Sequence, residues 1–324
     1  MFKSFLTYLF FLSFFTVAQA QDTAASYTKE LMIITENDNY NFTRKDRYYS
    51  NGIFIRYQWL AKRQAATNIA VKLHRVEAGQ MIYNPYLNRR SLEQVLEKQD
   101  RPYAGWLYAG YGQTNVFANE RVLQFDAVVG ILGPGSKGKE VQTNYHKLIS
   151  LYKIYGWENQ VQNEVGVNLS ARYYHPLIKQ TTGRKISLHA TGKATLGNTF
   201  TNASAGLLLK LGNSKKEQYT AFWTGGLGQT QKEQSKKTEA ILFLEPMLMA
   251  QLYNATVQGP LFRPDKGNYT ATLNPILYMI RGGGIVSGRR ISFSVTYTVK
   301  QREARSMIDP LEVFGAFAVS YRFR

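Results

Sequence analysis

Residues 315–323 read GAFAVSYRF, and residues 290–300 read RISFSVTYTVK. One face of the first stretch carries only large apolar side chains, namely Phe317, Val319, Tyr321 and Phe323. These side chains are two residues apart, so in an extended chain they share a face. Both stretches alternate in polarity over about ten positions, which is typical of a strand that crosses a membrane in a β-barrel. They therefore predict transmembrane β-strands.

The same alternation recurs along the chain, in segments that end in polar turns. We expect twelve strands, near residues 29–37, 50–60, 68–82, 103–115, 120–132, 159–173, 184–196, 200–212, 238–252, 268–281, 289–302 and 313–323. Residues 218–228, QYTAFWTGGLG, are a thirteenth candidate. We reject it because single-chain bacterial barrels have an even number of strands, and we expect a hairpin arm or an ordered loop there.

Composition favours a membrane barrel over a soluble β-sandwich, which would have similar strands. After residue 17 no stretch approaches the roughly 18 apolar residues of a spanning helix. A chain that enters a membrane without such a helix must close as a barrel. Aromatic residues make up 14% of the 324 residues, and Tyr and Trp favour sites where one end of the ring is wet. We predict an all-β fold, a twelve-stranded antiparallel transmembrane β-barrel with a short helix in an extracellular loop.

The N-terminus predicts export. Residues 1–3 are a short basic start, residues 4–17 are an apolar run, and residues 18–20 read AQA. This is the pattern of a secretory signal peptide, and a buried N-terminal helix is the alternative. We assign residues 1–20 to the signal peptide and residues 21–324 to an outer-membrane barrel with catalytic extracellular loops.

The charge balance points to anionic surfaces. The chain has 40 Lys and Arg against 22 Asp and Glu, and no cysteine. An exported protein this basic meets phosphorylated lipid rather than nucleic acid. The lack of cysteine excludes disulfides, thiolate metal sites and a cysteine nucleophile.

Most residues capable of chemistry fall in three of the expected outer loops. With both barrel ends in the periplasm, the outer connections are near residues 38–49, 83–102, 133–158, 197–199, 253–267 and 303–312. The first three, with the adjoining strand ends, carry nearly all of these residues. Functional residues are often found on loops above a rigid scaffold.

The first loop contains a cluster of oxygen-bearing side chains. Residues 36–39 read ENDN, and residues 46–52 read DRYYSNG. Carboxylate and amide oxygens in close succession suit a hard cation such as Ca²⁺. A polar hairpin loop is the alternative, since Asn, Asp and Gly all favour turns.

The third outer loop predicts a short helix over about residues 139–152, after the strand-ending GPGS of residues 133–136. On that helix Gln142 and His146 are four residues apart and therefore neighbours. Histidine is the usual general base near neutral pH. A surface histidine near the end of the helix is the alternative. We expect His74, His175 and His189 to be structural or solvated.

Two further motifs have less specific interpretations. Arg89 and Arg90 follow Pro85 just outside a strand, where they suit phosphate or an oxyanion or are ordinary interface arginines. Residues 100–108, DRPYAGWLY, predict a structural strand start with an aromatic girdle. No Gly-x-Ser-x-Gly elbow and no His-Glu-x-x-His motif occurs.

Together these segments resemble the outer-membrane lipid A 3′-O-deacylase family. The matching pieces, in order, are Asn37 and Asp38, residues 46–52, 82–85 (IYNP), 100–106, 133–134, 140–142 (EVQ), His146 and residues 156–160 (GWENQ). The resemblance is strong from residue 30 to about 166, and weaker but collinear through the C-terminal strands. Several motifs that occur in the same order argue against a chance match.

The resemblance implies a twelve-stranded barrel whose active site lies between the outer wall and a loop helix. It implies Ca²⁺-dependent hydrolysis of a 3′-O-linked acyloxyacyl ester of lipid A, the lipid part of lipopolysaccharide, in the bacterial outer membrane. We expect a monomer. The residues that match the family's site, as catalytic or metal-binding residues, are His146, Gln142, Asn37, Asp38, Ser50 and Arg89, with Asn37 and Asp38 on the metal.

The resemblance also shows departures. Ser50 stands where the family has Thr, and Arg89 (or Arg90, if the register shifts by one) stands where it has Lys. An acidic residue that the family can have six positions after the histidine is replaced by Tyr152. In the implied mechanism His146 activates a water, Gln142 orients the water or the histidine, and Ser50 and Arg89 bind the oxyanion or headgroup.

Two other functions fit a barrel of this kind. One is a different outer-membrane lipid esterase of the phospholipase type, which would need a Ser–His pair. The other is a non-enzymatic, porin-like barrel, which predicts a wide polar lumen. The chain ends Phe323-Arg324; similar barrels often end on an aromatic residue, and the extra arginine has no physical explanation.

Overall fold

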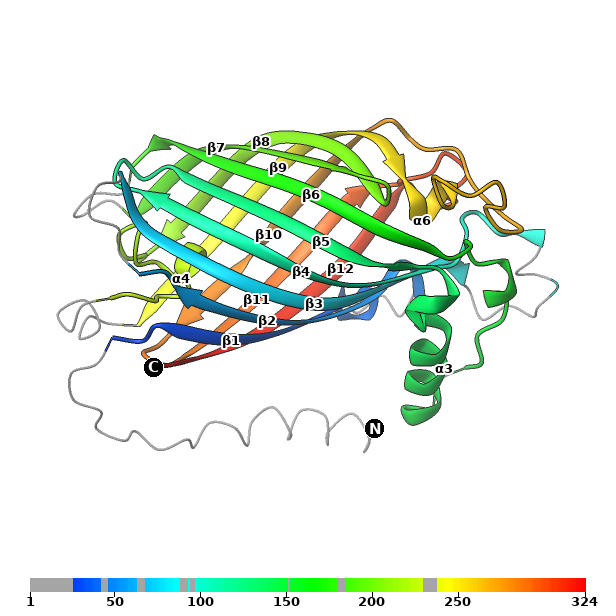
Figure 1. The fold of residues 1–324 in the computed structure, drawn as a ribbon, viewed down its shortest axis with the longest axis horizontal. Helices are drawn as coiled ribbons and strands as arrows, with labels where there is room; N and C mark the ends of the chain where they lie inside the picture. The colour runs from blue at the N-terminus through cyan, green and yellow to red at the C-terminus, as the bar shows by residue number, and fades with distance from the viewer. Residues whose placement is uncertain are drawn as a thin grey trace.

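Twelve antiparallel strands close into one barrel in the described part of the chain (Figure 1). The computed structural model describes residues 26–41, 46–62, 68–87, 93, 97–150, 152–179, 185–229 and 238–324. Each strand pairs with its neighbours in the chain, and β1 pairs with β12 to close the ring. The predicted fold class is confirmed, whereas the predicted signal peptide of residues 1–20 lies outside the described residues.

The strands are long enough to cross a bilayer at a tilt. They are β1 (Lys29–Asn37), β2 (Asp46–Leu60), β3 (Ile69–Leu87), β4 (Ala104–Phe117), β5 (Val122–Leu132), β6 (Glu164–Ile178), β7 (Ile186–Gly197), β8 (Phe200–Gly212), β9 (Glu239–Asn254), β10 (Ile276–Ser287), β11 (Ile291–Gln301) and β12 (Leu311–Phe323). No helix among the described residues has the length and apolar character needed to span a membrane.

The two ends of the barrel differ. One end carries the long connections, with the short helices η2 (Asp38–Asn41), η3 (Pro134–Ser136), α3 (Gly138–Leu148), η4 (Trp157–Asn159) and α6 (Ala255–Gln258) (Figure 1). The other end carries the C-terminus and short connections, apart from the long connection between β8 and β9 at residues 213–238. Because such barrels turn their short connections toward the periplasm, we call these the outer end and the inner end.

Most predicted strand bounds agree with the structure to within two residues. β2 starts earlier than predicted, at Asp46, and β3 continues further, to Leu87, while two other predicted strands are displaced along the chain. The predicted strand 159–173 starts at Glu164 instead, and the predicted strand 268–281 starts at Ile276 and continues to Ser287. The second error arises at Gly282–Gly284, since glycine weakens strands. A Cβ on Gly283 would collide with the Val295 carbonyl of the neighbouring strand. The close pairing therefore requires glycine here.

Residues 218–228 form an ordered loop, as the rejection of a thirteenth strand expected. They include the short helix α4 (Ala221–Thr224), which contacts β4 and β10 on opposite sides of the barrel. Trp223 and Leu227 are buried in a cluster with side chains from several strands, among them Val71, Val116, Tyr174, Leu208 and Phe243. We call residues 213–229 the plug, because they fill the inner end of the lumen.

The lumen itself is occupied by paired charges. Arg56 lies 2.6 Å from Glu77, and Glu245 accepts from both Arg172 at 2.8 Å and Arg281 at 3.1 Å. At the outer end a second buried apolar cluster, which includes Tyr83, Trp106, Leu132, Val161 and Ala255, lies above these pairs. Within the described residues the plug and this cluster cover the two ends of the lumen, and a cavity of about 510 Å³ remains between them, lined by side chains such as Arg56, Lys193 and Glu245. A covered cavity of this size does not match the wide polar lumen that the porin-like alternative predicts.

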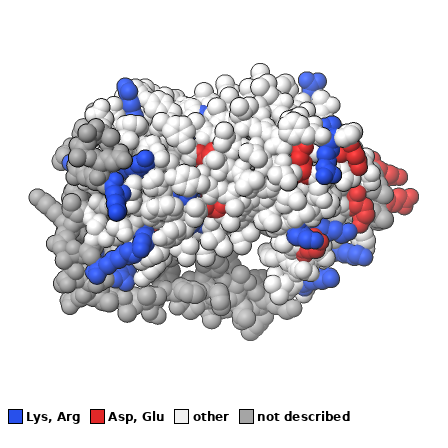
Figure 2. Space-filling model, in the orientation of Figure 1, with Lys and Arg blue, Asp and Glu red and all other residues white. Residues whose placement is uncertain are grey.

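The outer surface of the barrel matches a hydrocarbon environment. Apolar side chains point outward along most strands, for example Ile55, Val129, Leu169 and Leu248. Figure 2 shows charged side chains gathered toward the two ends, with an almost uncharged band between them. This band is the expected lipid-facing belt of a transmembrane barrel.

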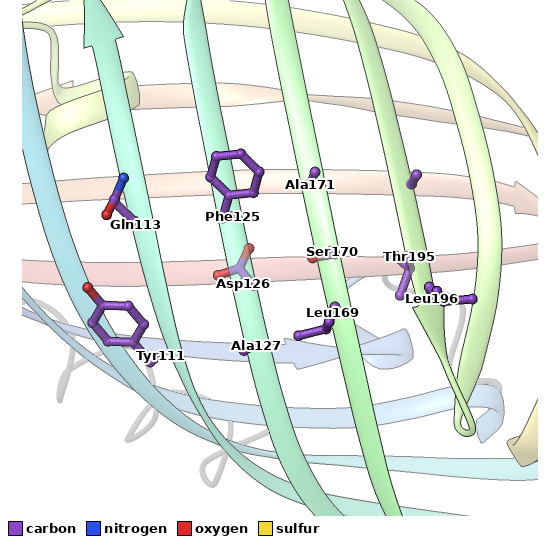
Figure 3. A pocket seen from close by; sticks show the side chains of 11 residues that line it. Tyr111, Gln113, Phe125, Asp126, Ala127, Leu169, Ser170, Ala171, Thr195 and Leu196 are labelled. Atoms are coloured by element: carbon purple, nitrogen blue, oxygen red, sulfur yellow. The ribbon is translucent and has the colours of Figure 1, made fainter. Parts of the chain in front are cut away.

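Small residues hollow the belt in places. A pocket of about 730 Å³ lies on the wall formed by β4–β7, where Ala127, Ala171 and Ala194 are flanked by larger side chains such as Phe125 and Leu169 (Figure 3). None of the site residues predicted from the sequence lines it. The pocket therefore belongs to the lipid-facing surface and not to the candidate site.

Candidate active site

Strand register aligns the outer ends of four neighbouring strands. Asn37 on β1 pairs with Asn51 on β2, Asn51 pairs with Ile82 on β3, and Ile82 pairs with Gly105 on β4. Residues that are far apart in the sequence are thereby brought to one level of the wall. The candidate site is built on this row.

Asn37 and Asp38 end β1 and begin η2, and both are buried, with exposed fractions of 5% and 2%. Asn37 Nδ2 donates to Asn51 Oδ1 at 2.6 Å, and Asn37 Oδ1 accepts from the Asn39 N–H at 2.7 Å. Asp38 Oδ2 accepts from the Arg47 N–H at 2.6 Å. The turn chemistry of the hairpin alternative is therefore present, and it holds a buried carboxylate at the strand end.

The oxygen atoms around Asp38 are of the kinds that bind a hard cation. In the described residues no three His, Cys, Asp or Glu side chains gather as a metal-binding group. A cation beside Asp38 would thus draw on amide and main-chain oxygens as well, which Ca²⁺ accepts. The amide oxygen of Asn37 has two lone pairs, so its hydrogen bond with Asn39 leaves ligand capacity.

Ser50 is fully buried between β1 and β3. Its hydroxyl contacts the Ile82 carbonyl at 3.4 Å, and it accepts from Asn51 Nδ2 at the same distance. These are long, weak hydrogen bonds. Through Asn51, Ser50 is connected to Asn37.

Helix α3 starts against the wall at this same level. A Cβ on Gly138 would lie 3.2 Å from the Gly105 Cα, so two glycines allow the helix to touch the strand. Gln80 Nε2 donates to the Ser136 carbonyl at 2.6 Å, and Ser136 Oγ donates to the Gly133 carbonyl at 2.6 Å. The predicted helix is confirmed, but it ends at Leu148 instead of continuing to residue 152.

Gln142 and His146 share the buried face of α3 with Gly138. Gln142 is 1% exposed, and its Oε1 accepts from the Trp157 indole N–H at 2.9 Å. Its Nε2 is buried without a hydrogen-bond partner among the described residues. This leaves two N–H donors of the amide oriented away from Trp157.

His146 is 5% exposed, so it is not the surface histidine of the alternative interpretation. Its Nδ1 lies 3.0 Å from the Tyr152 carbonyl, and its ring packs edge-on against the Tyr152 ring at 5.2 Å. Because a carbonyl only accepts, Nδ1 carries the proton and Nε2 is the acceptor nitrogen of the neutral ring. Tyr152 thus provides a main-chain oxygen where the resemblance allows an acidic side chain.

A small apolar cluster joins the strand-end residues around Ser50 to the buried face of α3. Ile82, whose carbonyl Ser50 contacts, packs with Tyr103, Trp157 and Ile154. Trp157 in turn holds Gln142. Trp157 was not among the predicted site residues, although residues 156–160 were part of the resemblance. It follows Gly156, whose φ of 95° makes a turn before it, and its indole contacts Gln142 on α3.

The paired arginines and residues 100–108 were also singled out in the sequence. Arg89 and Arg90 lie outside the described residues. Asp100 and Arg101 are structural, as predicted: Asp100 Oδ2 accepts from Tyr48 and from the Ile308 N–H, both at 2.9 Å. The aromatic girdle predicted there is wrong for Tyr103 and Trp106, which are buried.

The fold, and the contact of α3 with the outer ends of the strands, define a class of protein. It is an outer-membrane β-barrel with a candidate site between its wall and a loop helix. Within that class, the family model described as "Outer membrane protein LpxR" matches residues 5–323. The chain therefore belongs to the LpxR family of outer-membrane proteins. The resemblance to lipid A 3′-O-deacylases and the outer-membrane location are both confirmed by this match.

Solved structures agree on the fold. The chain is similar to LpxR from Salmonella typhimurium, at 21% identity over 91% of this chain and 100% of that chain, with a TM-score of 0.74. It is also similar to the β domain of the Bordetella autotransporter BrkA, at 8% identity over 92% of this chain and 99% of that chain, with a TM-score of 0.50. A comparison with curated protein sequences finds no match.

Proposed function

We propose that this protein is a lipid A deacylase that hydrolyses a 3′-O-linked acyloxyacyl ester by a water activated by His146. The observation that carries the proposal is the buried His146–Gln142 pair, set on α3 against the outer rim of a lipid-embedded wall. Family membership and the residue matches support the same substrate.

The histidine has the geometry of a general base. With Nδ1–H held by the Tyr152 carbonyl, Nε2 takes a proton from water, and the water oxygen bonds to the ester carbonyl carbon. The tetrahedral intermediate then collapses. The C–O bond to the sugar breaks, the protonated histidine returns its proton to the leaving alkoxide, and the free acid departs.

Gln142 and Asn37 have separate supporting roles in this step. Because Trp157 holds the Gln142 oxygen, the amide N–H groups orient the water or the histidine. Asn37 and Asp38 would hold Ca²⁺, which supplies positive charge for the oxyanion. Ser50, which is fully buried, supports Asn37 through Asn51. Arg89 and the exposed Lys137, Lys139 and Lys147 attract lipid A phosphates.

The test is mass spectrometry of lipid A from cells that express the wild-type protein or His146→Ala. We expect the wild type to remove one acyloxyacyl unit and His146→Ala to leave lipid A intact. His175→Ala is the matched control and should behave as the wild type. Intact lipid A with correctly assembled wild-type barrel would reject the proposal.

A serine-directed covalent inhibitor separates this mechanism from the phospholipase-type alternative. A water-based mechanism predicts that the inhibitor leaves the activity unchanged. Inactivation with covalent labelling of a serine would favour the alternative.

A further inference from the structure

Helix α3 has an exposed apolar stripe beside its buried face. Leu148 is 82% exposed, and Val141, Tyr145 and Ile149 are between 41% and 45% exposed. Their spacing of four, three and one residues places them along one side of the helix. Four large apolar side chains at this exposure are unusual on a surface that meets only water.

The opposite side of α3 is polar. Lys139, Glu140, Asn144 and Lys147 are all exposed there. Lys137 and Glu140 form an ion pair at 3.6 Å, and Lys139 pairs with Glu158 at 3.1 Å. A helix with a charged face and a large apolar face is suited to lie in a membrane interface.

The direction of α3 fits that position. In Figure 1 the helix runs across the long axis of the barrel at the outer end and projects away from the wall. A helix with this direction lies along the membrane plane when the barrel spans the membrane.

The lipid-facing belt extends to the level of α3. Gly105, which touches the start of α3, is two residues from the exposed Leu107 on β4. Val165, near the start of β6, is another outward apolar side chain of the same rim, at 65% exposed. The belt therefore reaches the level at which α3 leaves the wall.

We propose that the stripe of α3 (Val141, Tyr145, Leu148 and Ile149) is immersed in the acyl chains of the outer leaflet. The occupant is lipid and not a second copy of the chain, because the lipid-facing belt reaches the level at which α3 leaves the wall. The polar face of α3 then points to the headgroups and water.

The immersion of the stripe has a consequence for the candidate site. This consequence rests on the proposed function. The buried residues Gln142 and His146 lie next to the stripe around the helix. An ester near the top of the acyl region could meet them without leaving the bilayer. Helix α3 thereby becomes a membrane anchor as well as a carrier of the site.

The absence of cysteine from the chain makes a direct test simple. Single variants Leu148→Cys and Lys147→Cys are labelled with a nitroxide after the full chain is reconstituted in phosphatidylcholine vesicles. Leu248→Cys, on the belt, is the reference for a lipid-facing site. Accessibility to oxygen and to a water-soluble nickel complex is measured by electron paramagnetic resonance, and heat-modifiable migration verifies that each variant assembles.

We expect the label at position 148 to match position 248, with oxygen collisions exceeding those with nickel. The label at position 147 should show the reverse. Strong nickel access at both 147 and 148 overturns the proposal, because the stripe is then in water. An immobile label at 148 that neither reagent reaches also overturns it, because the stripe is then covered by protein. The accessibility measurement does not involve catalysis. Its result therefore distinguishes failure of this proposal from failure of the proposed function.

Discussion

At His146 a main-chain carbonyl takes the place of the carboxylate that often orients a catalytic histidine. The Tyr152 carbonyl selects the Nδ1–H form, which is what a general base acting through Nε2 requires. Every residue type has a main-chain carbonyl. Any residue at position 152 therefore supplies this acceptor, provided that the backbone after α3 has the same conformation. The replacement of an acidic residue by Tyr152 is thus compatible with the proposed chemistry.

His146→Ala should reduce the rate of ester hydrolysis by about 10²–10⁴-fold, because a positioned base contributes about that factor. The barrel should still assemble, since His146 lies on a loop helix outside the closed sheet. Single-turnover hydrolysis of purified lipid A, with heat-modifiable migration as the folding check, measures both effects.

Gln142→Ala should lose less than His146→Ala, because an orienting amide transfers no proton. His74→Ala and His175→Ala should stay near the wild type. Near-full activity of His146→Ala, with another histidine essential instead, would contradict the assignment of the base.

Removal of divalent ions should abolish deacylation, and added Ca²⁺ should restore it. The reason is the buried Asp38 carboxylate beside the Asn37 amide, a donor pair suited to a hard cation. Asp38→Ala should impair activity more than Asp46→Ala, the matched acidic control. Full activity in excess chelator would remove the cation from the mechanism.

At the scale of elements, α3 presents two different faces, one buried with Gln142 and His146 and one exposed and apolar. The glycine contact between Gly105 and Gly138 fixes where the helix meets the wall. Beyond that contact the helix projects from the wall, so its outer face meets whatever surrounds the barrel. Anchoring in lipid would hold His146 at a constant depth relative to the substrate.

Leu148→Ser should therefore lower deacylation of lipid A in bilayers and leave deacylation of detergent-dispersed lipid A nearly unchanged. The side chain is almost fully exposed, so the substitution removes a lipid contact and no internal packing. Parallel assays with both forms of substrate measure this difference. Equal losses in the two assays would show that Leu148 acts in some other way.

The outer loops are held together by a buried ionic cluster at Glu303. Arg101 lies 3.3 Å from this carboxylate and Lys300 lies 2.8 Å from it. Burial alone would raise the pKa of Glu303, but the two cations outweigh burial and hold the pKa below its ordinary value of 4.5. Its contribution to stability is thus fully present above pH 4.5 and is lost as pH falls through the lowered value.

Acidification below about pH 4.5 should loosen the outer loops before the barrel unfolds, since protonation of Glu303 removes both ion pairs. Limited proteolysis at pH 7 and at lower pH, with an acid-tolerant protease, detects the loosening. In Glu303→Gln the loops should be cleaved readily at both values of pH. Equal resistance of the wild type and Glu303→Gln at pH 7 would contradict this function of the cluster.

At the scale of the whole molecule, the described part of the chain covers the lumen at both ends and leaves a cavity of about 510 Å³ inside it. The plug closes the inner end, paired charges occupy the lumen, and a buried apolar cluster covers the outer end of the described structure. Lys210 on β8 donates to Glu217 of the plug at 2.6 Å, and the Trp223 indole donates to the same carboxylate. These contacts hold an otherwise polar loop inside the barrel.

Trp223→Ala should destabilise the protein by about 3–5 kcal/mol, the usual cost of truncating a buried aromatic side chain. A lower midpoint in heat-modifiable migration would record this loss. Phe222, which is only partly buried, provides the control: Phe222→Ala should cost less. Ion conductance of the wild type in planar bilayers should stay low, because the plug and the outer cluster cover the two ends of the lumen. A wide open pore would contradict this arrangement.

The strands were predictable because alternation is a local property. Whenever apolar residues recur at period two, one face of an extended chain is apolar, whatever the rest of the fold does. Residues 29–37 and 200–212 are strands over their full predicted lengths for this reason. Where local signals conflict with pairing, as at Gly282–Gly284, the prediction of strand bounds was wrong.

The sequence by itself determined the barrel class, the loop helix, the neighbouring Gln142 and His146, and the family. Only the tertiary structure decided which partner each side chain has. The register that aligns Asn37, Asn51, Ile82 and Gly105, the Tyr152 carbonyl at His146, and the plug inside the lumen all depend on closure of the sheet. Such contacts join residues far apart in the chain, and no local pattern encodes them, because register is settled only when all strands pair at once.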